Sequence, residues 1–273
     1  MAGDIGAQFR ALHRKGTPFI IPNPWDVGTA KLFEAQGFKA VATTSSGLAM
    51  SMGKGDGELD FDTVFAHCRA LCEAIDIPVA ADLENGLGHS PEDSARTIRE
   101  AADTGLAGAS IEDFTGDEAD PIYDFKKAVE RVAAAAEAAR GLDRDFVFTA
   151  RCENYLHGRS DLDDTIKRLV AYAEAGADVL YAPGLPDVAA IRKVVEAVGK
   201  PVNVLTGIRG LTFPVLDLAE AGVARISLGS AMARVAFEAL ARAGAEMLAT
   251  GRFGFVNDTD HIAPLEAAIT GKK

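Results

Sequence analysis

The sequence predicts a single α/β domain in which eight parallel strands close into a (β/α)8 TIM-type barrel. Short apolar runs alternate with segments of helical periodicity along the chain, which is the pattern of parallel strands joined by helical crossovers. Eight such units close a barrel, and 273 residues is an ordinary length for one barrel domain. No shift in composition marks a linker. We therefore expect one domain over 1–273, with the barrel over about 18–248 and a C-terminal extension over 249–273.

Each element follows from a local signal. Strands are expected where a short apolar run is bounded by glycine, proline or polar residues. Helices are expected where apolar residues recur at helical spacing. A short amphipathic lead-in over 1–17 comes first. The expected strands are 19–21, 40–43, 79–82, 108–111, 145–149, 178–181, 201–205 and 225–228, and the expected helices are 27–36, 61–75, 90–105, 124–140, 160–175, 186–198, 213–221 and 230–248.

The start of the third expected helix carries a clear capping signal. Ser90 is a good N-cap, Pro91 suits the first turn, and Glu92 and Asp93 lie at the positive end of the helix dipole. The polar, glycine-bearing segment 44–60 is expected to be a loop. A doubly wound open sheet is the alternative fold, but it would carry a G-x-G-x-x-G turn after an early strand, and none is present.

Composition excludes several classes of function. Lys plus Arg number 28 against 40 for Asp plus Glu, and no basic stripe is visible, so a nucleic-acid partner is not expected. No apolar run approaches the roughly 18 residues needed to cross a membrane, so no membrane partner is expected either. The three cysteines form an odd set in a chain without a signal peptide, which favours reduced thiols and a cytoplasmic protein.

Two carboxylates end the third expected strand. Asp82 and Glu84 are two residues apart, and in an extended chain that spacing places both side chains on one face, about 7 Å apart. They could share one hard cation directly or through its water shell. A solvated strand end is the alternative interpretation of such an isolated pair.

Further charges fall at the ends of neighbouring strands. Glu112 follows the fourth, Arg151 and Glu153 follow the fifth, and Asp56 lies in the loop after the second. The carboxyl ends of all barrel strands open at one mouth, so these carboxylates would repel one another unless a divalent cation lay among them. Oxygen ligands alone favour Mg²⁺, or Mn²⁺, over zinc.

Other residues at the same mouth suit an anionic substrate. Arg151 offers a planar fork for a carboxylate or phosphoryl group. The backbone amides around Ser46, Gly47 and Leu48 can approach an oxygen that becomes negative during a reaction. Asn203, at the end of the seventh expected strand, either bonds the substrate or is a buried amide that links strands.

The motifs taken together resemble the phosphoenolpyruvate mutase and isocitrate lyase superfamily. They are S-G-L at 46–48, D-L-E-N-G at 82–86, S-I-E-D at 110–113 and A-R-C-E-N at 150–154, and the match spans about 18–250. This resemblance implies a barrel whose last helix is exchanged with a neighbouring subunit, a homotetramer, and a Mg²⁺ site that serves small 2-oxo or 2-hydroxy carboxylic acids.

The resemblance also implies roles for the acidic residues. By position, Asp82 is similar to the direct metal ligand of the family. Glu84 and Glu112 are similar to the residues that hold the waters of the metal, and Asp56 is similar to the acidic residue on a gating loop.

The resemblance assigns the substrate contacts as well. The amides of Gly47 and Leu48, with Ser46, look like the pocket for the carboxylate and keto oxygen of the substrate. Arg151 looks like the partner of the departing or transferred group. Residues 114–124 depart from the family, because they contain neither the Cys nor the His of the K-[KR]-C-G-H loop of isocitrate and methylisocitrate lyases. They are also acidic, which disfavours a dianionic phosphonate.

The expected function is therefore a Mg²⁺-dependent lyase that cleaves or decarboxylates a small oxaloacetate-like or methylisocitrate-like acid through a pyruvate enolate. A phosphoenolpyruvate or phosphonopyruvate mutase or hydrolase is one alternative, and a non-catalytic acid-binding barrel is another. His157 and His89 lie near the expected mouth and are candidates for a proton-transfer or a structural role. A rival phosphate site would use backbone amides after the last two strands, at Gly207, Gly210, Gly229 and Ser230.

Overall fold

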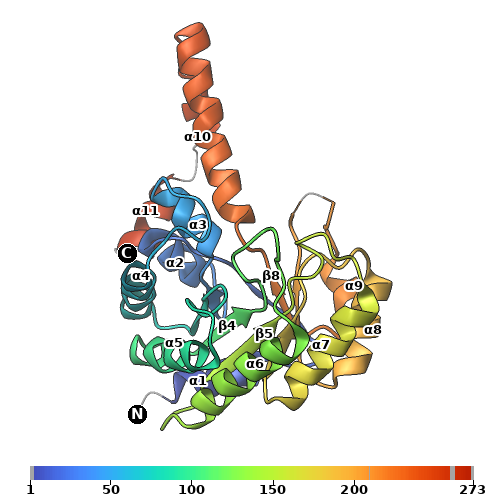
Figure 1. The fold of residues 1–273 in the computed structure, drawn as a ribbon. Coiled ribbons are helices and arrows are strands. Elements are labelled where there is room, and N and C mark those ends of the chain that lie inside the picture. The colour runs from blue at the N-terminus through green and yellow to red at the C-terminus, as the bar shows by residue number, and fades with distance from the viewer. Residues whose placement is uncertain (1–2, 209, 259–261, 272–273) are drawn as a thin grey trace.

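The computed structural model describes residues 3–208, 210–258 and 262–271, and it confirms the barrel fold. Eight parallel strands form one sheet in the order β1-β8-β7-β6-β5-β4-β3-β2, with helices around the outside (Figure 1). The strands are β1 (Phe19–Ile21), β2 (Val41–Ala42), β3 (Val79–Asp82), β4 (Gly108–Glu112), β5 (Val147–Arg151), β6 (Val179–Tyr181), β7 (Val202–Leu205) and β8 (Arg225–Ser227).

The barrel is nearly closed, and Asn23 bridges the seam between β1 and β2. The Ala42 amide donates to the Pro22 carbonyl at 3.0 Å, next to the end of β1. The Asn23 side chain donates to the carbonyls of Ala42 and Thr43, both at 3.1 Å, and accepts from the Leu228 amide at 2.9 Å. One buried amide therefore joins β8 to β2 across the end of β1.

The helices lie where helical spacing predicts them, with differences of a few residues at their ends. Ser90 and Asp93 form a reciprocal capping box at the start of α5, which confirms the capping signal read from the sequence. The helices are α1 (Ile5–Leu12), α2 (Val27–Ala35), α3 (Ser45–Ser51), α4 (Phe61–Ala74), α5 (Pro91–Asp103), α6 (Phe125–Arg140), α7 (Leu162–Glu174), α8 (Val188–Val198), α9 (Val215–Glu220), α10 (Ala231–Thr250) and α11 (Ile262–Thr270).

Two segments differ from expectation. The prediction of a loop over 44–60 was wrong in its first half, because Thr44 caps α3 by accepting from the Gly47 amide. The C-terminal extension forms a short 3-10 helix, Gly254–Asp258, and then α11, which packs against α2. Within the described residues, no helix combines the length and apolarity needed to cross a bilayer.

Helix α10 projects away from the barrel (Figure 1). Ala233 near its start is buried, whereas Val235, Leu240 and Leu248 are exposed. The exchange of this helix with another subunit stays a prediction, because the structure contains one chain.

The bottom of the barrel is closed by α1. Phe9 is fully buried against Ile21, Val147 and Val179 in a separate apolar cluster beneath the strands. Gly6 allows this close approach, because a Cβ at this position would lie 1.8 Å from the Asp145 carbonyl oxygen. The N-terminal helix is therefore part of the core, because it packs against the N-terminal ends of the strands.

Gly6→Ala is expected to destabilise the fold by about 1–3 kcal/mol, because α1 must shift away from β5 to avoid the Asp145 carbonyl. Urea unfolding measures the change. Gly28→Ala in α2 is the matched control, because the nearest atom to its new methyl group would be Asp26 Oδ1, at an ordinary contact distance of 3.4 Å. That control is expected to be neutral or slightly stabilising. Equal stability of the two variants would contradict the tight packing of α1.

Candidate active site

A cavity of about 240 Å³ opens at the carboxyl ends of the strands and extends down into the barrel. Register partners in parallel strands share a face, and two such rows line the cavity: Asp82, Ser110 and Thr149 form one, and Tyr181, Asn203 and Arg225 form the other. Barrel interiors are usually filled by bulky branched side chains. The cavity exists because small residues take several of these places, namely Ala42, Ala80, Ala109, Ser110 and Thr149.

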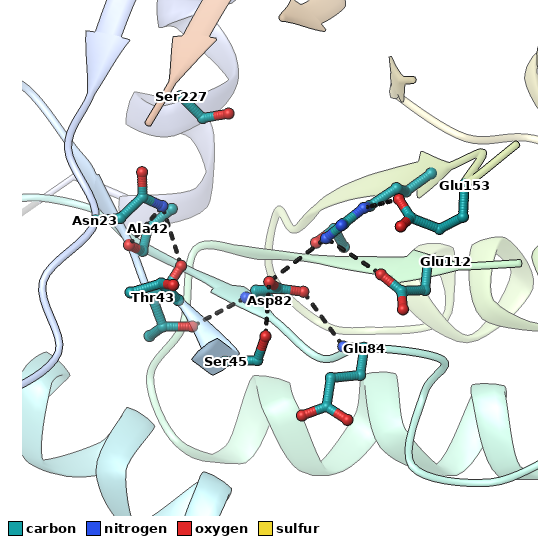
Figure 2. Close-up of polar contacts among 12 residues, drawn as sticks. Asn23, Ala42, Thr43, Ser45, Asp82, Glu84, Glu112, Glu153 and Ser227 are labelled. Atoms are coloured by element: carbon teal, nitrogen blue, oxygen red, sulfur yellow. Dashed lines mark hydrogen bonds and ion pairs between the residues drawn. The ribbon is translucent and has the colours of Figure 1, made fainter. Parts of the chain in front are cut away.

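Asp82 lies at the centre of the polar groups at this mouth (Figure 2). Its backbone amide donates to the Thr43 hydroxyl at 3.0 Å, and its carboxylate accepts from the Ser45 hydroxyl at 3.3 Å and from the Glu84 amide at 3.3 Å. The carboxylate is thus oriented by β2, by the start of α3 and by its own turn.

Arg151 joins the carboxylates on the other side of Asp82. Its Nη1 atom lies 3.5 Å from Asp82 Oδ2 and 3.1 Å from Glu112 Oε2, and its Nε donates to Glu153. The guanidinium also lies over the Tyr181 ring, 5.1 Å from its centroid. The sequence-based view of Arg151 as a free fork for the substrate needs correction, because three carboxylates of the protein already share this cation. Its catalytic role stays a prediction.

The spacing of two residues predicted that Glu84 shares a strand face with Asp82, and this prediction was wrong. Strand β3 ends at Asp82, and Glu84 has a left-handed backbone with φ of 49°. Such a conformation is costly for a residue with a side chain, and it is found mainly at functional sites and turns. The side chain runs toward the loop after α3, where a Cβ added to Gly57 would lie 3.9 Å from Glu84 Oε2. Glu84 therefore approaches the mouth from the loop side.

The electrostatics of the mouth are those of an incompletely neutralised anionic site. Burial, then Asp82 and Asp56, raises the pKa of Glu84 to about 7. Burial raises the pKa of Asp56, with Asp82 adding to the effect, and burial raises the pKa of Glu112 despite the nearby Arg151. With Asp82 and Glu153, five carboxylates thus gather around Arg151. A hard divalent cation would relieve their repulsion.

The donor set fits a metal bound partly through water. Within the three described ranges, no three His, Cys, Asp or Glu side chains lie close enough to hold a metal ion directly. The available oxygens from Asp82, Glu84 and Glu112 instead suit Mg²⁺, which keeps several of its waters and takes one or two carboxylates.

Glu84→Gln is expected to stabilise the metal-free protein above pH 7. With its pKa near 7 in the folded state against 4.5 ordinarily, Glu84 binds its proton more tightly when folded. Stability therefore falls as pH rises from about 4.5 to 7, and the glutamine removes this loss, worth about 3 kcal/mol at pH 8. Urea unfolding at pH 5 and pH 8 with a chelator measures it. Glu73→Gln, on the exposed face of α4, is expected to show no such pH-dependent gain.

The unbonded amides at the start of α3 lie two residues earlier than expected. The Gly47 amide donates to Thr44 Oγ1 at 3.2 Å and the Leu48 amide donates to the Thr44 carbonyl at 3.0 Å, so neither is free for a substrate oxygen. In the described structure the amides of Ser45 and Ser46 make no hydrogen bond, and both residues line the cavity. The assignment of Gly47 and Leu48 is thus corrected, whereas Ser46 lies where the sequence placed it.

Asn203 is a buried amide that links strands, and its contact with the substrate stays a prediction. It lines the cavity, and it also links strands by donating to Ser227 Oγ at 2.9 Å and accepting from Arg225 Nε at 3.0 Å. His157 stacks on Phe114, with ring centroids 3.9 Å apart, and its Nε2 lies 3.6 Å from Glu153 Oε2.

Of the remaining candidates, some line the cavity and others lie outside it. His89 lies outside it and bonds the Tyr123 hydroxyl at 2.6 Å. Of the proposed phosphate-binding amides, Gly229 and Ser230 line the cavity, whereas Gly207 and Gly210 do not. Asp56, on the expected gating loop, lines its rim.

Sequence reasoning missed Arg225, a second arginine that lines the cavity from below. The sequence did contain a signal for it. Arg225 and Ser227 alternate with Ile226 in the eighth strand, so both lie on one face of that strand, and Asn203 is the register partner of Arg225 on the neighbouring strand. Asn23 was also missed, although it follows the first strand directly.

The chain is similar to known proteins over most of its length. A family model described as phosphoenolpyruvate phosphomutase matches residues 9–248. A crystal structure from Burkholderia cenocepacia J2315, provisionally named a lyase/mutase, is 52% identical with a TM-score of 0.93 and covers 96% of this chain and 94% of that one. The 2-methylisocitrate lyase of Escherichia coli K12 is 31% identical over 72% of this chain and 68% of its own length.

A more distant structure shares the fold. Phosphonopyruvate hydrolase, crystallised in complex with oxalate and Mg²⁺, is 23% identical with a TM-score of 0.82, over 98% of this chain and 95% of that one. The family match covers the barrel and every acidic residue at its mouth. The chain therefore belongs to the phosphoenolpyruvate mutase and isocitrate lyase superfamily, as its motifs indicated.

Proposed function

We propose that this protein is a Mg²⁺-dependent carbon–carbon lyase that cleaves or decarboxylates a small 2-oxo or 2-hydroxy carboxylic acid through a pyruvate enolate. The observation that carries the proposal is the group of five carboxylates, Asp56, Asp82, Glu84, Glu112 and Glu153, around the cation of Arg151. A scaffold without a metal would gain nothing from that repulsion. The lyases among its relatives support the carbon–carbon assignment.

The residues of the mouth divide into a metal side and an amide side. Asp82 would hold Mg²⁺, or Mn²⁺, directly, and Glu84 and Glu112 would hold its waters. When bound, the ion would supply positive charge beside the oxygens of a 2-oxo acid. The amides of Ser45 and Ser46 would donate to the oxygen on which charge develops. Arg151 would hold the Glu112 and Glu153 side chains in position at the mouth.

The cavity favours a small acid. Its volume of about 240 Å³ lies below the range of roughly 300–1,000 Å³ that is usual for drug-sized ligands. The segment 114–124, which departs from the family loop, adds the exposed acids Asp117, Glu118 and Asp120 at the mouth side of β4. These charges disfavour a dianionic phosphonate.

Turnover of a panel of acids tests the proposal. Oxaloacetate, methylisocitrate, 2,3-dimethylmalate and phosphonopyruvate are assayed side by side with Mg²⁺ and with a chelator. Metal-dependent release of a 2-oxo acid from one of the first three is expected. Turnover of phosphonopyruvate alone would replace the lyase with phosphonate chemistry, and Mg²⁺ binding without turnover of any acid would favour a non-catalytic acid-binding barrel.

We also propose that the protein assembles as a homo-oligomer, with a tetramer as the expected state. The support is the projecting helix α10, whose exposed Val235, Leu240 and Leu248 lack cover from the rest of the chain (Figure 1). Light scattering coupled to size-exclusion chromatography measures the mass. A monomer at micromolar concentration would contradict the proposal.

A further inference from the structure

We infer that Arg225 forms a second anion-binding position at the floor of the cavity, and that the substrate is a dicarboxylate whose far carboxylate binds there. This inference rests on the proposed function and adds the substrate class. It depends on the position of Arg225, on the groups that its guanidinium contacts, and on the absence of a carboxylate partner among the described residues.

Arg225 lies inside the barrel below the acidic mouth. It begins β8 and is in register with Phe19 of β1 and Asn203 of β7, so its side chain starts from an inward position. The residue is 6% exposed and lines the cavity from which Asp82 and Arg151 are also reached. The cavity therefore has an acidic, metal-binding end at the mouth and a cationic end at the floor.

The guanidinium is held by three neutral groups. Its Nε donates to Asn203 Oδ1 at 3.0 Å, and its Nη2 donates to Thr149 Oγ1 at 3.2 Å. Its Nη1 lies 3.2 Å from His13 Nε2. His13 Nδ1 lies 2.9 Å from the Phe9 carbonyl, so Nδ1 carries the proton and Nε2 accepts from Arg225. These contacts position the fork and leave one N–H of each terminal nitrogen unused.

No carboxylate of the described chain pairs with Arg225. Its position differs in this respect from that of Arg151, which is paired with Asp82, Glu112 and Glu153. A buried cation without a counter-ion is costly, and burial accordingly lowers the pKa of Arg225 to about 10. The guanidinium nevertheless stays charged at neutral pH. A ligand carboxylate that enters the cavity would supply the missing charge.

The charges of a small dicarboxylate suit both ends of the cavity. One carboxylate with its adjacent oxygen would lie at the metal-binding end, and the second would reach the fork of Arg225, where bidentate recognition suits a carboxylate. The hydroxyls of Thr149 and Ser227 line the same floor. A monocarboxylic acid with a methyl group at that end would leave the cation unpaired, so the floor discriminates against it.

A matched pair of acids tests this inference. Malate and 2-hydroxybutyrate have the same four-carbon chain and differ by a terminal carboxylate in place of a methyl group. Calorimetric titration with Mg²⁺ present is expected to show at least tenfold tighter binding of malate by the wild-type protein. Arg225→Gln is expected to bring the two affinities within about twofold, and Arg225→Lys, which keeps the charge, is expected to retain an intermediate preference. Arg192→Gln, on the outer helix α8, is the matched control.

The outcomes separate this inference from the proposed function. Equal binding of the two acids by the wild-type protein would overturn the role of Arg225, even if Arg225→Gln failed to fold. An undiminished malate preference in folded Arg225→Gln would overturn it as well. Loss of turnover for every 2-oxo acid would instead remove the proposed reaction, while an Arg225-dependent preference for malate would still support the dicarboxylate site, because the titration needs no turnover.

Discussion

Asp82→Asn is expected to lower kcat/KM for the best acid by about 10³-fold or more and to abolish measurable Mg²⁺ binding. The substitution keeps the size of the side chain and its acceptor for Ser45, so the start of α3 should stay in place. It removes the charge that would hold the cation directly. A bound metal contributes several kcal/mol of transition-state stabilisation, which corresponds to this loss of rate. Steady-state kinetics and calorimetric titration with Mg²⁺ measure both effects.

The control for this substitution is Asp62→Asn in the first turn of α4, where the side chain is exposed. It makes the same chemical change and is expected to leave both quantities within about twofold, because a surface charge at this distance from the mouth is screened. If Asp82→Asn kept Mg²⁺ affinity and turnover, Asp82 could not be the direct ligand, and the proposed metal site would have to be abandoned.

Asp113→Ala is expected to destabilise the protein by about 3–5 kcal/mol. Asp113 is 3% exposed and lies directly after β4, facing away from the barrel interior. Its carboxylate accepts from the Tyr172 hydroxyl at 2.6 Å, from Arg168 Nη1 at 3.3 Å and from the Glu153 amide at 2.8 Å. Alanine would leave three buried donors without this acceptor, one of them charged. Urea unfolding measures the loss.

The same substitution is expected to reduce activity in the protein that remains folded. The Asp113 carboxylate holds the Glu153 backbone, and the Glu153 side chain holds Arg151 at the mouth. Asp120→Ala, an exposed change in the following loop, is the control and is expected to shift stability by less than about 0.5 kcal/mol. A small effect at Asp113, equal to that control, would show that the network behind β4 does not support the site.

The fold could be predicted from the sequence because it depends on the alternation of short apolar runs with helical spacing and on the number of such strand–helix units. Apolar runs located all eight strands, and the capping residue Ser90 marked the start of α5 through a local hydrogen bond. Charged residues at the ends of runs also placed Asp82, Glu112 and Arg151 at a common mouth. Parallel strands in a barrel present their carboxyl ends at one rim, so this inference needed no coordinates.

Other parts of the site depend on groups that are distant in sequence or on backbone angles. The left-handed φ of Glu84 turned its side chain toward Gly57, although a spacing of two suggested a shared strand face. The amides of Gly47 and Leu48 donate to Thr44 at the helix cap, which leaves the half-buried amides of Ser45 and Ser46 without a hydrogen bond in the described structure.

Periodicity and composition determined the class of this protein, the place of its acidic mouth and the family to which it belongs, because each of these depends on residue types at regular spacing. Tertiary structure alone decided how the charges are shared. Arg151 is surrounded by carboxylates from three strand ends, whereas the partners of Arg225 among the described residues are neutral and include His13, 212 residues away in the chain. Local sequence cannot encode which buried charge meets its counter-ion, since that pairing arises only when distant strands close around a common interior.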